Sequence, residues 1–315
     1  MSETVCAVVV TRNRLTLLRE CLTALGAQTR ALDRVVVVDN ASSDGTLDAL
    51  QRDFPEVDVL ALSENEGGAG GFHEGLREAY AGGADWVWLM DDDTISRRDA
   101  LAELVSARDA SAGLPAPLLL ASKAEWDDGS LHPMNTPGFE RYRTELVIRA
   151  AELGLMPLRT TTFVSLLVAR QAVERFGLPP KHFFIWSDDI EYTARILRHA
   201  AGYLVPASVV NHRTTTPYTA VTTTGGRFYF HVRNTIYMIR GDAWSTSEKL
   251  PLVWIVFATS LAYLRHNAFS RASALTVMRG LRDGVRPLPT GRPRGRERRG
   301  RPRGGWLAGL ARGRP

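Results

Sequence analysis

Three adjacent aspartates, Asp91, Asp92 and Asp93, carry the most specific chemistry in this 315-residue chain. They directly follow the apolar run WVWLM at 86–90, which predicts a buried strand that ends at the carboxylates. Neighbouring carboxylates repel one another, and hard divalent cations bind such groups and connect them to the phosphates of a substrate. The cluster therefore indicates a cation site for a phosphorylated ligand. A solvated acidic loop is the alternative.

A second carboxylate pair, Asp188 and Asp189, follows the aromatic run at 182–186 and precedes a predicted helix at 192–200. Carboxylates at a helix N-terminus are stabilised by the helix dipole, so capping is one interpretation. The other is a general base that removes the proton of an acceptor hydroxyl. Trp186 and Tyr192 flank the pair, and both could stack on a sugar.

The segment NEGGAGGF at 65–72 has four glycines in five positions. Glycine lets the backbone approach a ligand closely, and backbone amides can bind phosphate. The spacing matches neither GxGxxG in a first βα turn nor GxxxxGK[ST], which disfavours dinucleotide and Walker-type sites. We expect a loop that lines a ligand site and leads into a helix at 76–81. A flexible turn without a ligand is the alternative.

Alternating strands and helices must position these groups. Over roughly the first 110 residues the pattern predicts a parallel sheet with crossover helices, whose strands end at one edge. Polar clusters follow each of the first four strands and should converge there, unless they reflect ordinary loop polarity. The middle, 111–160, shows no strong period. Further elements are expected as strands at 163–169, 203–205 and 209–212, and as a helix at 170–176. His212 ends the last of these strands, and a lone histidine is usually structural.

Composition excludes several classes of protein. Apolar residues make up 44% and charged residues 23%, which argues against a disordered chain, a fibre and a multi-span membrane protein. Two cysteines, Cys6 and Cys21, are too few for a disulfide scaffold. The N-terminus MSETVCAVVV has no basic region and no cleavage site, so no signal peptide is expected and the protein is placed in the cytoplasm.

The positive charge is concentrated at the C-terminal end. Residues 286–315 hold ten arginines and one glutamate, a net +9 in a chain of net +5, so the other 285 residues carry −4. A nucleic-acid-binding core is therefore disfavoured, and the tail is expected to be disordered. The apolar stretch at 251–264 is too short to span a membrane, which leaves a core helix or an interfacial helix.

Taken together, the motifs resemble glycosyltransferase family 2 with the GT-A fold, over about residues 5–240. The resemblance is to bacterial galactofuranosyltransferases that begin the cell-wall galactan, and rhamnosyltransferases of the family share much of it. The motifs that carry it are VVVTRNR (8–14), VVVVDNASSDGT (35–46), NEGGAGGF (65–72), GADWVWLMDDD (83–93), FFIWSDDIEY (183–192), NHRT (211–214) and FYFHVRNTIY (228–237).

The resemblance implies a role for each matching residue. Asp91 and Asp93 would bind Mn²⁺ or Mg²⁺ on the donor diphosphate, with His212 as a further ligand. Asp189 would be the general base, and Asp188 would orient the acceptor. The remaining candidates would bind the donor nucleotide and line its pocket: Thr11, Arg12, Asp39, Asn65, Gly68, Gly70, Gly71 and Asp92.

The sequence thus predicts an α/β protein with three parts: a GT-A domain at 1–240, a helical and membrane-associating extension at 241–285, and a disordered tail at 286–315. We expect a metal-dependent, inverting transferase that uses UDP-galactofuranose, or alternatively dTDP-rhamnose. A lipid-linked glycan is the expected acceptor, at the inner face of the bacterial cell membrane, because the apolar segment and the cationic tail suit an anionic surface. A non-catalytic sugar-nucleotide or glycan-binding module is the alternative of another class, and no nucleic-acid partner is expected.

Overall fold

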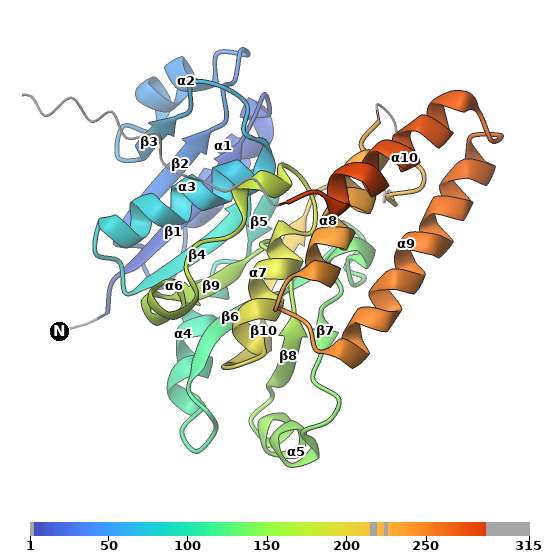
Figure 1. Ribbon diagram of the computed structural model, residues 1–315. Coiled ribbons are helices and arrows are strands. Elements are labelled where there is room, and N and C mark those ends of the chain that lie inside the picture. The colour runs from blue at the N-terminus through green and yellow to red at the C-terminus, as the bar shows by residue number, and fades with distance from the viewer. Residues whose placement is uncertain (1–2, 215–218, 224–225, 288–315) are drawn as a thin grey trace, which may run out of the picture.

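A mixed sheet forms the centre of the computed structural model, which describes residues 3–214, 219–223 and 226–287 (Figure 1). The strands follow the order β3-β2-β1-β4-β9-β6-β10-β8-β7, with β5 paired to β10. Their bounds are β1 (Val5–Thr11), β2 (Arg34–Asp39), β3 (Asp58–Ala61), β4 (Trp86–Asp91), β5 (Thr94–Ser96), β6 (Pro117–Glu125), β7 (Gly138–Phe139), β8 (Met156–Thr160), β9 (Leu166–Ala169) and β10 (Ala201–His212).

Helices pack against this sheet, and three further helices follow its last strand at the C-terminal end of the described chain. The mostly parallel sheet with flanking helices matches the predicted GT-A-type architecture. The α-helices are α1 (Leu15–Gly26), α2 (Thr46–Asp53), α3 (Gly67–Ala81), α4 (Ala100–Ala110), α5 (Thr144–Glu152), α6 (Arg170–Phe176), α7 (Asp188–Leu197), α8 (Phe228–Arg240), α9 (Thr246–His266) and α10 (Arg271–Val285), with short 3₁₀ turns at Pro133–Asn135 and Lys181–Phe183.

The first four strands are parallel, and their carboxyl ends lie at one edge of the sheet, as the sequence predicts. β1 pairs with β2 so that Thr11 faces Asp39, and with β4 so that Val10 faces Asp91. Every residue of β1 is buried, which explains its unbroken run of apolar side chains. β9 departs from this pattern, because it runs antiparallel to both β4 and β6.

The glycine-rich segment was predicted as a loop, and that prediction is wrong. Its glycines belong to α3, which begins at Gly67 and lies across β1 and β2 (Figure 1). A Cβ at Gly71 would lie 2.4 Å from Cγ1 of Val10, and one at Gly75 would lie 2.4 Å from Cγ1 of Val8. Both distances are far below van der Waals contact. The glycines therefore bring a helix unusually close to the sheet.

Other boundaries also differ from the sequence-based prediction. The stretch without a period contains β6, α5 and β8, and α7 begins at Asp188 instead of residue 192. The two strands expected near the end of the sheet form one strand, β10, with a register shift between Val205 and Val209. Pro206 lies in that shift and lacks an N–H for the ladder, so it interrupts the pattern of a continuous strand.

The three last helices form a separate layer beside the sheet, with α9 at the outer edge of the molecule (Figure 1). α8 and α10 approach each other closely at two glycines. A Cβ at Gly280 would lie 2.8 Å from Cβ of Val232, and one at Gly284 would lie 2.8 Å from Cβ of Ile236. The apolar stretch 251–264 lies in α9, and few of its side chains are buried. Among the described helices, none is long and apolar enough to cross a membrane. Residues 288–315 of the predicted tail lie outside the described residues.

Candidate active site

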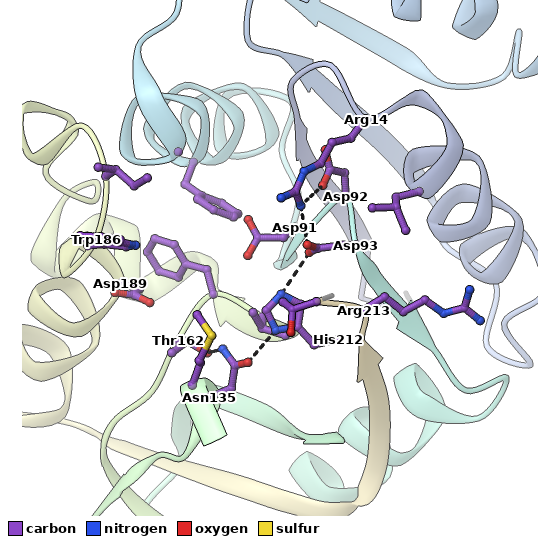
Figure 2. Close-up of a pocket in the computed structure, with 18 of the residues that line it drawn as sticks. Arg14, Asp91, Asp92, Asp93, Asn135, Thr162, Trp186, Asp189, His212 and Arg213 are labelled. Carbon is purple, nitrogen blue, oxygen red and sulfur yellow. Dashed lines mark hydrogen bonds and ion pairs between the residues drawn. The ribbon is translucent and has the colours of Figure 1, made fainter. Parts of the chain in front are cut away.

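A pocket of about 580 Å³ opens at the carboxyl edge of the sheet, where the end of β4 meets the start of α7 (Figure 2). Its walls come from segments far apart in the sequence: the end of β4, the turn at 134–135, residues 162–164, residues 185–189 and the end of β10. The ionisable residues that line it are Arg14, Asp91, Asp92, Asp93, Asp188, Asp189, His212 and Arg213.

Asp91, Asp93 and His212 form a candidate cation site. One ligand atom from each of the three residues lies within 4.8 Å of the others. Oδ1 of Asp93 is buried, and within the described residues it makes an ion-pair contact with His212 but no well-aligned hydrogen bond. Nε2 of His212 lies 3.1 Å from that oxygen. Carboxylate and imidazole groups suit Mn²⁺ and Mg²⁺, and a cation would satisfy the buried oxygen, so the residues present fit a metal.

Asn135 fixes the orientation of the His212 ring. Nδ1 of His212 lies 2.7 Å from Oδ1 of Asn135, whose Nδ2 donates to Oγ1 of Thr162 at 3.1 Å. Because an amide oxygen can only accept, the ring proton resides on Nδ1 and Nε2 is turned toward Asp93. Such outer hydrogen bonds orient histidine ligands in metal sites. Burial alone would lower the pKa of His212, but the carboxylates Asp93 and Asp91 outweigh it and raise that pKa above its usual value.

The three aspartates have different environments. Burial, reinforced by the charge of Asp93, raises the pKa of Asp91 to about 7. Burial also raises the pKa of Asp92 to about 6, although Oγ1 of Thr11 donates to it at 2.7 Å. Burial would raise the pKa of Asp93 too, but His212 and Arg14 together outweigh it and hold that pKa below its usual range. Asp92 thus ties β1 to β4 while Asp93 faces the cation site.

Arg14 is a member of the site that the sequence analysis did not select. Its Nη1 lies 2.5 Å from Oδ2 of Asp93 and 3.4 Å from Oδ1 of Asp92. The candidate from the same turn was Arg12, whose side chain is exposed and does not line the pocket. Arg14 ends the VVVTRNR motif, so the motif contained the residue but gave no reason to prefer it.

Asp189 lies on the opposite wall of the pocket (Figure 2). Asp188, beside it in the first turn of α7, also lines the pocket. Burial, together with the charge of Asp189, raises the pKa of Asp188 well above its usual range. Burial also raises the pKa of Asp189, to about 6. Trp186 lines the same wall, whereas Tyr192 does not. Tyr192 is fully buried in the core, so the prediction that it flanks a sugar is wrong.

The residues predicted to bind the donor are only partly brought together. Gly68 lines the pocket, whereas Gly70 and Gly71 face Glu66 and Val10 inside the fold. Asn65 instead accepts a hydrogen bond from the N–H of Gly67 at 3.0 Å.

Thr11 and Asp39 are buried side by side at the ends of β1 and β2. Oδ2 of Asp39 accepts from the N–H of Ser42 at 3.1 Å. Its Oδ1 is buried and has no partner within the described part of the chain. An unsatisfied buried carboxylate oxygen is costly, and it leaves an acceptor for a ligand at this edge.

The family model "Glycosyl transferase family 2" matches residues 6–160, which include the Asp91–Asp93 cluster. A curated galactofuranosyltransferase, GlfT1 of Mycobacterium tuberculosis strain H37Rv, is 33% identical over 207 residues, covering 63% of this chain and 66% of that protein. The chain belongs to glycosyltransferase family 2. As a family 2 member it is a glycosyltransferase. GlfT1 of Mycolicibacterium smegmatis is 29% identical over 277 residues, covering 81% of this chain and 89% of the relative.

Solved structures confirm the fold of this family 2 chain. S. aureus TarS 1–349 in complex with UDP-GlcNAc superposes with a TM-score of 0.60 at 16% identity, covering 89% of this chain and 80% of that one. GalNAc-T7 with UDP, GalNAc and Mn²⁺ gives a TM-score of 0.54 at 13% identity, covering 79% and 53%. At these identities the likeness concerns the GT-A fold alone.

Proposed function

We propose that this protein is a metal-dependent, inverting glycosyltransferase that moves a sugar from a nucleotide-diphosphate donor to an acceptor hydroxyl. One observation carries the proposal. A cation site made by Asp91, Asp93 and His212 faces the carboxylate of Asp189 across a single pocket of about 580 Å³. A phosphate-binding cation and a separate general base are the two groups that this reaction requires.

The cation end of the pocket would hold the donor diphosphate. Asp91, Asp93 and His212 would bind Mn²⁺ or Mg²⁺, and the metal would offset the charge that develops on the leaving diphosphate. Asn135 would keep Nε2 of His212 directed at the site through its 2.7 Å contact with Nδ1. Arg14, held by Asp92 and Asp93, adds a fixed positive charge beside the same position.

Asp189 would supply the base. As the acceptor oxygen attacks the anomeric carbon, its proton passes to the Asp189 carboxylate, and the bond from that carbon to the diphosphate oxygen breaks with inversion. A pKa of about 6 lets Asp189 be ionised at neutral pH while remaining basic enough to accept the proton. Asp188, whose pKa burial raises well above its usual range, would orient the acceptor through a hydrogen bond.

The donor that we favour is UDP-galactofuranose. The curated relatives are galactofuranosyltransferases, and a solved structure of the same fold holds a UDP-sugar. Thr11, Arg12, Asp39 and Asn65 would hold the nucleotide beside Gly68. The free Oδ1 of Asp39 would accept an N–H of the base.

The proposed acceptor is a lipid-linked glycan at the cytoplasmic face of the cell membrane. α9 presents large apolar side chains to solvent, with Leu250 71% and Trp254 65% exposed. No charged residue occurs between Lys249 and Arg265 at its two ends. An apolar stripe with basic ends suits the interface of an anionic bilayer. We therefore propose residues 1–240 as the catalytic part and 241–285 as the part that contacts the membrane.

A donor screen tests this proposal. Purified protein with Mn²⁺ is supplied with a panel of sugar nucleotides, and release of UDP or dTDP is followed in the presence of a glycolipid acceptor. We expect UDP release with UDP-galactofuranose and its loss on addition of a chelator. Release of dTDP from dTDP-rhamnose instead would change the donor. Binding without turnover for every donor would favour a non-catalytic sugar-nucleotide module.

A further inference from the structure

The Arg-Asn pair of α8, Arg233 and Asn234, has no role in the proposed chemistry, yet it contacts the segment that leads to Asp189. We infer that Arg233 and Asn234 are positioning residues that hold residues 182–187 in the one conformation that directs Asp189 into the pocket. The inference rests on the proposed function, because it takes Asp189 as the base.

The segment is strained. Phe184, Trp186 and Ser187 have φ values of 65°, 65° and 67°, which place three non-glycine residues in the left-handed region. Such residues persist only where the surrounding structure imposes the conformation, and they cluster at active sites. Ser187 is the N-cap of α7, and its side chain makes no capping hydrogen bond. A backbone bond from the N–H of Ile185 to the carbonyl of Phe183, at 2.8 Å, is local, and the remaining support comes from other elements.

Asn234 contacts the segment from α8. Its side chain is fully buried, and Nδ2 donates toward the carbonyl oxygens of Phe183, Ile185 and Trp186 at 3.1, 2.9 and 2.8 Å. Two amide hydrogens serve three acceptors, so one hydrogen is shared. A single amide group thus contacts three carbonyls within four positions, 183–186, which restrains the turn.

Arg233 fixes Asn234 and adds contacts of its own. Its Nε and Nη2 donate to Oδ1 of Asn234 at 3.0 and 2.9 Å, which determines which way the amide faces. Nη2 also donates to the carbonyls of His182 and Phe183 at 3.0 and 2.8 Å. The guanidinium lies over the rings of Tyr229, Phe230 and Tyr237, at 5.3, 4.9 and 5.4 Å from their centroids. These ring contacts hold the Arg233 guanidinium in place.

The opposite side of the segment rests on α3. The carbonyl of Phe184 accepts from the N–H of Ala69 in α3 at 3.1 Å. The ring of the same residue contacts α8, where it stacks on Phe230 with 5.2 Å between the ring centroids. A Cβ at Gly67 would lie 1.9 Å from the Phe184 oxygen, so only glycine permits this approach. The segment is clamped between α8 and the end of α3 that carries the pocket residue Gly68. Loss of either side would release the base.

The test compares Asn234→Leu with Thr235→Val. Leucine has the same branched shape as asparagine, is larger, and has no donors. Thr235 is the matched control, because it is also buried on α8 and, among the described residues, its hydroxyl bonds only to the carbonyl of His231 in its own helix. Arg233→Lys is the second variant, in case Asn234→Leu does not fold, because lysine keeps the charge and loses the fork. Each protein is assayed for amide hydrogen exchange, for binding of Mn²⁺-UDP and for transfer.

In Asn234→Leu we expect amide exchange across 182–189 to rise about tenfold or more. Turnover should fall about 10²-fold, the cost of a base displaced by about 1 Å, while affinity for Mn²⁺-UDP stays within about threefold. Arg233→Lys should change exchange and turnover in the same direction, and Thr235→Val should change neither.

Unchanged exchange in Asn234→Leu, or faster exchange with full turnover, would overturn the inference. So would an equal loss in Thr235→Val. If the wild-type protein releases no nucleotide from any donor, the proposed function fails, and the exchange data still decide whether the pair holds the segment.

Discussion

Replacement of Gly75 by alanine should destabilise the protein, against the usual preference for alanine in a helix. Gly75 lies in the middle of α3. A Cβ there would be 2.4 Å from Cγ1 of Val8 and 2.9 Å from Cγ2 of Val38. Both valines are fully buried, and β-branched side chains have few alternative rotamers, so neither can easily move away. The helix itself must shift away from β1 and β2.

The size of the effect follows from two opposing contributions. Overpacking a filled core costs about 1–3 kcal/mol, and two overlaps at one atom place Gly75→Ala near the upper end. The gain in helix propensity returns about 1 kcal/mol. The net loss should be about 2 kcal/mol. Gly68→Ala is the matched control, because no atom lies within 4 Å of its Cβ position in the same helix. That variant should be neutral or more stable by up to about 1 kcal/mol.

Urea unfolding of the two variants beside the wild type measures the difference. The midpoint should fall for Gly75→Ala and stay or rise for Gly68→Ala. If Gly75→Ala matched or exceeded the stability of the wild type, close approach of α3 to the sheet would not be the reason for glycine at this position. The account of the glycine-rich motif as a packing device would then be refuted.

Three further outcomes are expected. Asp93→Ala should abolish both transfer and Mn²⁺ binding, which calorimetry measures. Asp99→Ala should alter neither, because Asp99 is exposed. If Asp93→Ala still bound Mn²⁺, Asp93 would not belong to the cation site. Asp189→Asn should lower kcat about 10²–10⁴-fold with unchanged nucleotide affinity. The kcat of the wild type should fall as the pH drops below about 6, because Asp189 must be ionised and its pKa is about 6. If kcat did not change with pH in this acidic range, Asp189 would not be the base. Trp254→Glu should weaken sedimentation with anionic vesicles. Tyr142→Glu should not, because Tyr142 is 89% exposed but distant in sequence from α9. Equal sedimentation of both variants and the wild type would exclude α9 as the membrane contact.

The sequence was most informative where one residue type serves one purpose. Unbroken apolar runs predicted β1, β2 and β4, and the polar residues after them predicted the edge where the pocket lies. It misled where a residue type serves two purposes. Glycine suits both a loop around phosphate and a helix pressed against a sheet, and only the neighbours Val8 and Val10 distinguish them. Tyr192 suits both a sugar platform and a core.

The rest of the site was hidden because it depends on three-dimensional proximity. Asn135 lies in a stretch without periodicity, and nothing along the chain links it to His212. Arg14 and Arg12 are alternatives within one turn, and the turn's backbone decides which reaches Asp93. The Arg233-Asn234 pair was visible as part of a motif. Its function depends on carbonyl groups about fifty positions earlier, at 182–186, and backbone carbonyls leave no trace in a sequence.

The position of β9 has a consequence for how the chain can fold. β9 (Leu166–Ala169) joins the N-terminal strands to the rest of the sheet, because it lies between β4 and β6. β6 has β9 and β10 as its two neighbours, and both come after residue 160. The segment that carries the family signature, 6–160, therefore contains a strand with no neighbour and leaves one edge of β4 open. Until later residues are synthesised, these edges are free to pair with other chains. A fragment that ends at residue 160 should aggregate, although it holds the most recognisable half of the protein.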